Sequence, residues 1–148
     1  MPHLTLEYSA NLAAGEANAN ANANPNADSI GQLCASLAQC LAQCVDSGQE
    51  GHPRVYPLGG IRVRALCCEH YSIADGQPDA AFLHANLKIG AGRSEAIKKA
   101  TGDALFERIK QHFATQFEQH GLALSLEINE FSEAGSWKHN NLHARFKK

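Results

Sequence analysis

The spacing of apolar residues switches between two periods along the chain, and this switching constrains the fold more than any other feature. Apolar residues alternate over His3–Tyr8, recur every third or fourth residue from Ser29 to near Gly48, and alternate again over Ile61–Leu66. Alternation predicts a strand with one buried face, and the longer period predicts an amphipathic helix. Ser29 and Gln32 have the spacing of a capping box at the helix start. The first half therefore predicts the order β-α-β.

The second half of the chain repeats this order. Ala81–Ile89 alternates, two nearby glycines end the strand, and Ser94 can cap a helix that continues to Gly121. Leu122–Phe131 then predicts a fourth strand. The whole pattern predicts an α+β protein of the order β-α-β-β-α-β, with a four-stranded sheet and two helices on one face.

One segment stands outside this pattern. Residues 13–27 are a low-complexity run of alternating Asn and Ala, which supplies little apolar surface to bury. We expect an exposed loop without a role in the chemistry. A chain of 148 residues with this single run of elements fits one domain, residues 1–148.

Charge and cysteine content narrow the functional classes. Thirteen Lys plus Arg against fifteen Asp plus Glu give a net charge of −2, which argues against a nucleic-acid partner. No apolar run approaches the roughly 20 residues of a membrane helix, and the first residues lack the pattern of a secretion signal. Five cysteines are an odd number for a disulfide framework. We therefore expect a soluble protein of the cytoplasm without a membrane partner.

A strand-to-helix junction offers a candidate anion site at Gly90-Ala91-Gly92-Arg93-Ser94. Free N–H groups at a helix start attract anions, and the Arg93 guanidinium suits a carboxylate. A dinucleotide fingerprint is excluded, because Glu95 stands where its third glycine would fall. The alternative is an arginine on a solvated loop.

Two further candidates are the arginines of the second predicted strand and the residue that follows Met1. Arg62 and Arg64 share a strand face opposite Val63 and would need an anion if a partner subunit buried them. Pro2 would present a secondary amine if Met1 were removed, and nearby arginine charge would lower the pKa of that amine. An amine that is neutral near pH 7 can act as a general base.

The cysteines suggest a rival hypothesis. Cys40 and Cys44 are one helical turn apart, and Cys67-Cys68 with His70 follows a predicted strand. Together they could form a thiolate-rich metal site. However, Cys40 and Cys44 also fit the apolar stripe of their helix, where free cysteine acts as a small hydrophobe. The packing interpretation is favoured, and no metal site is predicted.

Five short motifs are found along the chain. They are Met1-Pro2-His3, Pro57-Leu58-Gly59-Gly60-Ile61-Arg62, Ala74-Asp75-Gly76-Gln77, Leu87-Lys88-Ile89-Gly90-Ala91-Gly92-Arg93-Ser94 and Lys138-x-Asn140-Asn141-x-His143-Ala144-x-Phe146. Together these motifs resemble the 5-carboxymethyl-2-hydroxymuconate delta-isomerase family of the tautomerase superfamily. The resemblance spans nearly the whole chain, and the chain departs from the family in the longer Asn/Ala segment.

The resemblance implies a homotrimer without a cofactor, in which Pro2 lies in a pocket near subunit contacts. It implies isomerisation of 5-carboxymethyl-2-hydroxymuconate to 5-carboxymethyl-2-oxo-hex-3-ene-1,6-dioate, in homoprotocatechuate (4-hydroxyphenylacetate) degradation. Pro2 would be the base, while Arg62 and Arg93 would bind the carboxylates of a dicarboxylate or tricarboxylate substrate. Arg64 is a weaker binding candidate. The alternative is a non-catalytic module of the same fold that binds a small anion or a metal.

Overall fold

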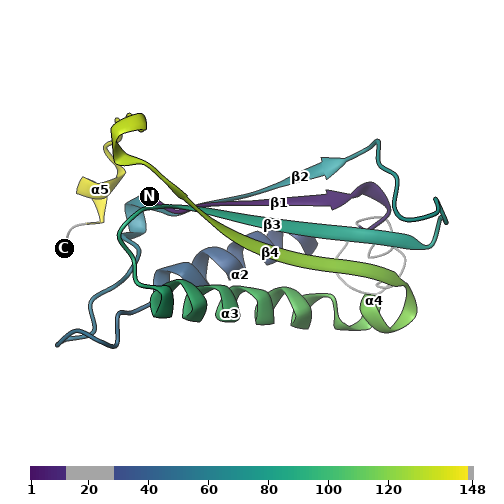
Figure 1. The fold of residues 1–148 in the computed structure, drawn as a ribbon, viewed down its shortest axis with the longest axis horizontal. Helices are drawn as coiled ribbons and strands as arrows, with labels where there is room; N and C mark the ends of the chain where they lie inside the picture. Colours follow the sequence, from purple (N-terminus) through teal and green to yellow (C-terminus); the bar gives the residue numbers. More distant parts are fainter. Residues whose placement is uncertain (13–28, 147–148) are drawn as a thin grey trace.

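The computed structural model describes residues 1–12 and 29–146 and contains a four-stranded mixed sheet (Figure 1). The predicted strand order along the chain is confirmed, and the Asn/Ala-rich segment 13–27 lies outside the described residues. Across the sheet the strands lie in the order β2-β1-β3-β4. Their bounds are His3–Ser9 for β1, Arg62–Cys68 for β2, Ala80–Gly90 for β3 and Gly121–Phe131 for β4.

Two β-α-β units form this sheet. In the first unit β1 and β2 are parallel, with His3 opposite Arg62. In the second unit β3 and β4 are parallel, with Ala80 opposite Gly121. The two units meet through the antiparallel pair of β1 and β3. The units therefore run in opposite directions, and each begins at a different end of the sheet.

The helices α2 (Ser29–Gln43) and α3 (Glu95–His112) cover one face of the sheet, as predicted (Figure 1). Alternate residues of the two central strands are buried beneath them, and burial of each leucine or isoleucine among them contributes about 1.5–3 kcal/mol. The core consists of Leu4, Leu6, Leu12, Ile30, Leu33, Leu37, Cys40, Leu41, Tyr56, Ala81, Leu83, Ala85, Leu87, Ile89, Leu105, Ile109 and Phe113. In the described part of the chain, none of the helices combines the length and apolar character of a membrane span.

The first helix ends earlier than predicted. It stops at Gln43 rather than near Gly48, because the chain turns back and Val45 forms a β-bridge with Arg54. Ser29 is the first residue inside α2, and its hydroxyl is hydrogen-bonded to Nε2 of His112 at 2.9 Å. The start of α2 is thus tied to the end of α3.

The second predicted helix is broken in two. It ends at His112, and the short helix α4 spans Ala114–Gln119. Phe113 between them has φ −103° and ψ 16°, and its side chain is fully buried. The break keeps Phe113 in the core and leaves Phe117 59% exposed. Apolar spacing continues through the break, which is why the sequence predicted one helix.

The chain after β4 returns to the amino-terminal end of β1. It forms the 3-10 turn η2 (Glu133–Gly135) and the short helix α5 (Leu142–Arg145), which lies near the N-terminus in Figure 1. This helix packs on a second 3-10 turn, η1 (Leu58–Gly60). A Cβ on Gly59 would lie 2.8 Å from the backbone nitrogen of His143, so this contact requires glycine. The sequence did not predict this packing.

Candidate active site

The amino terminus is fixed at the edge of the sheet where β1 and β2 both begin. Pro2 is buried, and its carbonyl accepts a hydrogen bond from the backbone N–H of Arg62 at 3.0 Å. Because β1 and β2 are parallel, their first residues lie side by side. The register therefore brings together two residues, Pro2 and Arg62, that are far apart in the sequence.

Arg62 is half-buried and hydrogen-bonded to the turn before its own strand. Its Nη1 donates to the carbonyl of Gly59 at 3.1 Å and to that of Ile61 at 2.8 Å. The η1 turn thus holds the guanidinium beside the amino terminus. An arginine restrained in this way loses little side-chain entropy when it binds a carboxylate.

Arg93 approaches the same end of the sheet from the turn after β3. Gly92 has φ +102°, a conformation that favours glycine, and it redirects the chain into α3. The two terminal nitrogens of Arg93 donate to the carbonyls of Gly90, at 2.8 Å, and Val55, at 3.3 Å. Its buried Nε has no partner among the described residues. The alternative interpretation, an arginine on a solvated loop, therefore does not describe Arg93, which is half-buried and hydrogen-bonded.

Tyr56 provides the surface against which Arg93 packs, and sequence reasoning missed it. The Arg93 guanidinium carbon lies 4.9 Å from the centre of the Tyr56 ring, within cation–π range. The fully buried Tyr56 hydroxyl donates to Oγ1 of Thr101 at 3.2 Å. Burial raises the pKa of Tyr56, so the phenol remains neutral. The sequence indicated a loop rich in Gly and Pro around Tyr56, but it gave no signal for the contact between Tyr56 and Arg93.

The start of α3 is capped as predicted. The hydroxyl of Ser94 accepts from the backbone N–H of Ile97 at 3.3 Å. Glu95 lies in the first turn and forms an ion pair with Lys98, whose Nζ is also 3.6 Å from Glu130. A carboxylate of the protein itself thus lies at this helix start, and binding of an external anion there stays a prediction.

The segment after β4 adds a third cation to the site. Nζ of Lys138 lies 3.2 Å from Oε1 of Glu133 and 5.2 Å from the centre of the Phe131 ring. Further along the chain, Nδ2 of Asn140 contacts Sδ of Met1 at 3.4 Å. The Lys138 motif was visible in the sequence, but its place beside the amino terminus depends on the fold.

These charges act together on the amino terminus, which Met1 carries in the described chain. Burial lowers the pKa of this amine most, and the charges of Lys138, Arg93 and Arg62 lower it further. Glu133 acts in the opposite direction. A general base at this position must be unprotonated. The surrounding cations favour this state, because they disfavour the ammonium form of the amine.

Arg64 is not brought to this cluster. It is exposed on the sheet face opposite the helices, two residues beyond Arg62 on β2. Burial and then the charges of Arg64 and Arg62 lower the pKa of His3, but Arg64 is not among the groups that act on the amino terminus. Arg62 and Arg64 do share a face, as predicted.

The structure does not assemble the alternative metal site. Cys67 and Cys68 pair with Tyr8 and Ser9, at the opposite end of β1 from Pro2. Cys44 lies just after α2, where its thiol donates to the carbonyl of Cys40 at 3.3 Å. The Cys44 thiol and the Arg108 guanidinium lower the pKa of Cys40 to about 6 against the effect of burial. Within residues 1–12 and 29–146, no group of three or more His, Cys, Asp or Glu side chains could hold a metal ion.

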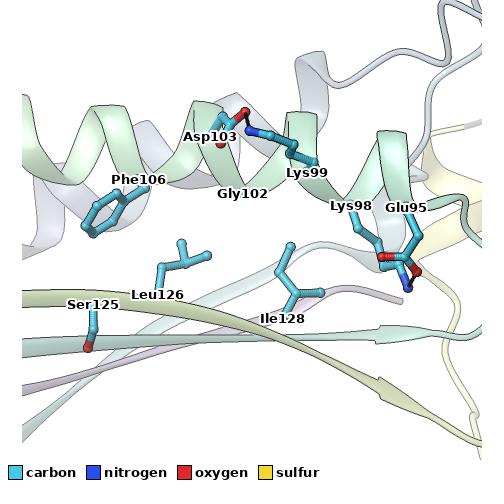
Figure 2. A pocket seen from close by; sticks show the side chains of 9 residues that line it. All are labelled: Glu95, Lys98, Lys99, Gly102, Asp103, Phe106, Ser125, Leu126 and Ile128. Carbon is cyan, nitrogen blue, oxygen red and sulfur yellow. Dashed lines mark hydrogen bonds and ion pairs between the residues drawn. The ribbon is translucent and has the colours of Figure 1, made fainter.

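An open groove of about 620 Å³ between α3 and β4 lies apart from the amino-terminal cluster (Figure 2). Its floor is formed by Leu126 and Ile128, and its rim carries the ion pair of Lys99 and Asp103 at 2.6 Å. Neither Pro2 nor the arginines line it. Charges on the rim are paired with each other, which distinguishes this groove from the amino-terminal cluster.

The fold and the cluster define a small α+β protein of two β-α-β units with a cationic amino-terminal site. Residues 2–146 match the family of 5-carboxymethyl-2-hydroxymuconate isomerase, and the chain belongs to this family. The 5-carboxymethyl-2-hydroxymuconate Delta-isomerase of Escherichia coli is 48% identical over 93 residues, which are 63% of this chain and 74% of that protein.

Solved structures agree with this assignment. A 5-carboxymethyl-2-hydroxymuconate isomerase from Deinococcus radiodurans R1 is 48% identical and superposes with a TM-score of 0.79, over 99% of this chain and 95% of its own. A structure described as a fused 4-OT wild type asymmetric trimer is 15% identical, with a TM-score of 0.56 over 97% of this chain and 99% of its own. At that identity the likeness concerns the fold alone, which is tautomerase-like.

Proposed function

We propose that the protein isomerises 5-carboxymethyl-2-hydroxymuconate to 5-carboxymethyl-2-oxo-hex-3-ene-1,6-dioate, with the nitrogen of Pro2 as the base. The observation that carries this proposal is the position of buried Pro2 beside Arg62, at an amino terminus where Arg93 and Lys138 also lower the pKa of the amine. Membership of the isomerase family supports the choice of substrate. The reaction would serve homoprotocatechuate (4-hydroxyphenylacetate) degradation.

The proposed reaction moves one proton and changes no atom count. The 2-hydroxyl proton leaves the enol, the 2-oxo group forms, and the double bonds shift so that C5 receives a proton. Pro2 would take the proton from oxygen and deliver it to carbon. Arg62 and Arg93 would bind carboxylates and stabilise the negative charge that develops on the oxygen. In this scheme the active form lacks Met1, because the nitrogen of Pro2 is otherwise part of a peptide bond.

We infer a homotrimer for the active protein. The sheet face opposite the helices carries polar and charged residues, including Arg64, His84 and Asn86, and a neighbouring subunit would cover it. A distant relative of the same fold is described as a trimer. All five cysteines are free thiols, which supports a reducing cytoplasm as the location.

The first experiment measures the intact mass of the purified protein and follows loss of the enol substrate by ultraviolet absorbance. An amine-directed inactivator is then added. We expect the mass to lack Met1, and we expect the inactivator to abolish turnover with one modification at Pro2. A free Pro2 amine without turnover would contradict the proposed substrate and favour another dicarboxylate or a binding module. Turnover with Met1 retained would contradict the role of Pro2.

A further inference from the structure

The substrate named in the proposed function carries three carboxylates, whereas the two arginines account for two. Muconate is a six-carbon diene with a carboxylate at each end, and the carboxymethyl arm on C5 adds the third. The two terminal carboxylates are conjugated with the diene and suit planar guanidinium forks. The third rotates freely on a CH₂ group and suits an ammonium, which donates in three directions. A third cation is therefore to be expected near Pro2.

Lys138 lies beside the residue that precedes Pro2. Asn140, two residues after Lys138, contacts Sδ of Met1 at 3.4 Å. On another side, a Cβ on Gly60 would lie 3.3 Å from Cα of Met1. The segment that contains Lys138 and the turn η1 thus both border the space that Met1 occupies. Removal of Met1 would free that space next to the nitrogen of Pro2.

Lys138 also joins the cluster that contains Arg93. Oε1 of Glu133, the ion-pair partner of Lys138, lies 3.4 Å from the position of a Cβ on Gly90. The carbonyl of Gly90 in turn accepts from Nη1 of Arg93 at 2.8 Å. Glu133, the partner of Lys138, thus lies next to the residue whose carbonyl binds Arg93.

We propose that Lys138 is the residue that binds the carboxymethyl carboxylate of the substrate. This inference depends on the proposed function and names a specificity-determining contact within it. The Lys138 side chain is 29% exposed, against 75% for Glu133, so much of the lysine side chain packs against its neighbours. Of the charged groups, Lys138 also lowers the pKa of the Met1 amine most, ahead of both arginines. Glu133 holds the ammonium in place when the site is empty.

The test compares two substrates, 5-carboxymethyl-2-hydroxymuconate and 2-hydroxymuconate, which lacks the carboxymethyl arm. Lys138→Ala should raise KM for the first substrate by about tenfold or more, the scale of a lost hydrogen bond to a charged group, and change kcat less. For the second substrate, kcat/KM measured at a pH above the acidic limb of the profile, where the amine is unprotonated in both proteins, should change less than about threefold. Lys138→Arg should restore most of the affinity.

A matched control comes from Lys110, at the far end of α3. Lys110 pairs with Glu107 at 2.5 Å and lies 5.8 Å from the centre of the Phe106 ring, so it has the same two kinds of partner as Lys138, one Glu and one Phe. Lys110→Ala should leave both substrates unaffected. Thermal unfolding of each variant reports whether a change in activity comes from folding.

The outcomes separate the two proposals. An unchanged KM for Lys138→Ala, or an equal loss on both substrates, would overturn the role of Lys138 and leave the isomerase proposal standing. If the wild-type protein converts only the tricarboxylate, the kinetics on that substrate decide. A rise in KM for Lys138→Ala without a matching fall in kcat, reversed in Lys138→Arg, supports the role of Lys138, and the absence of this pattern overturns it. If it converts neither substrate, the proposed function fails and the role of Lys138 fails with it.

Discussion

The two ends of the sheet have the same backbone arrangement but differ in their electrostatics. The two parallel strands of each β-α-β unit start side by side at one end of the sheet. β1 and β2 start at one end, and β3 and β4 start at the other. At the first end, Pro2 precedes β1 next to Arg62. At the second end, Asp79 precedes β3 and His120 precedes β4. The two β-α-β units thus create two equivalent positions, one where β1 and β2 start and one where β3 and β4 start.

The two positions differ in whether their charges are paired. Nδ1 of His120 lies 2.7 Å from Oδ1 of Asp79, so the Asp79 carboxylate has a partner within the protein. A small cavity of about 190 Å³ at the second end is lined in part by Asn11, whose amide donates to the carbonyl of Ala80 at 2.8 Å. At the first end, cations surround the amino terminus with one opposing carboxylate, that of Glu133. The comparison teaches that the side chains at the strand starts, and not the fold, decide where an anionic substrate can bind.

Removal of a cation from the first end should have the largest effect. Arg93→Ala leaves the Tyr56 ring without its cation and removes a carboxylate-binding fork from the site. We expect kcat/KM for 5-carboxymethyl-2-hydroxymuconate to fall by about 100-fold or more, with the oligomeric state unchanged in size-exclusion chromatography. The control is His120→Ala at the other end. Similar losses of kcat/KM in Arg93→Ala and His120→Ala would contradict a functional difference between the two ends of the sheet.

A change of charge beside the amine should shift the pH dependence. Glu133 raises the pKa of the Met1 amine. In the proposed active form the Pro2 amine takes the place of the Met1 amine beside this carboxylate, so Glu133→Gln should lower its pKa and extend the unprotonated form to lower pH. The acidic limb of the kcat/KM profile should move to lower pH, by less than about one unit for one partly exposed charge. Lys138→Ala should move it in the opposite direction. A shift of both variants in the same direction would contradict the assignment of this limb to the amine.

The second end should respond least. Asp79→Asn removes the exposed ion pair with His120. We expect the free energy of unfolding to fall by about 1 kcal/mol or less, as is typical of solvent-exposed pairs, with kcat/KM unchanged. Denaturant titration and steady-state kinetics check the two parts. A clear fall in kcat/KM for Asp79→Asn would show that this end takes part in function.

The sequence predicted the strands and their order well, because alternation reports directly which face of a strand is buried. It missed the break at Phe113, since a buried residue at a helix end keeps the apolar period intact. Pro2 and Arg93 were visible as candidates from local patterns. The positions of Tyr56 and Lys138 relative to Arg93 were not, because they depend on contacts between segments far apart in the chain.

The contact of α5 with Gly59 has a consequence for the order in which the protein is made. Domains begin to fold from the amino-terminal side during synthesis, so all four strands can emerge from the ribosome before residues 138–146 do. The strands, together with Arg62 and Arg93, therefore leave the ribosome before Lys138 and α5 do. Closing the backbone of α5 over Gly59 would be a late step in maturation, and the newly made chain would gain its fold before it gains its third cation.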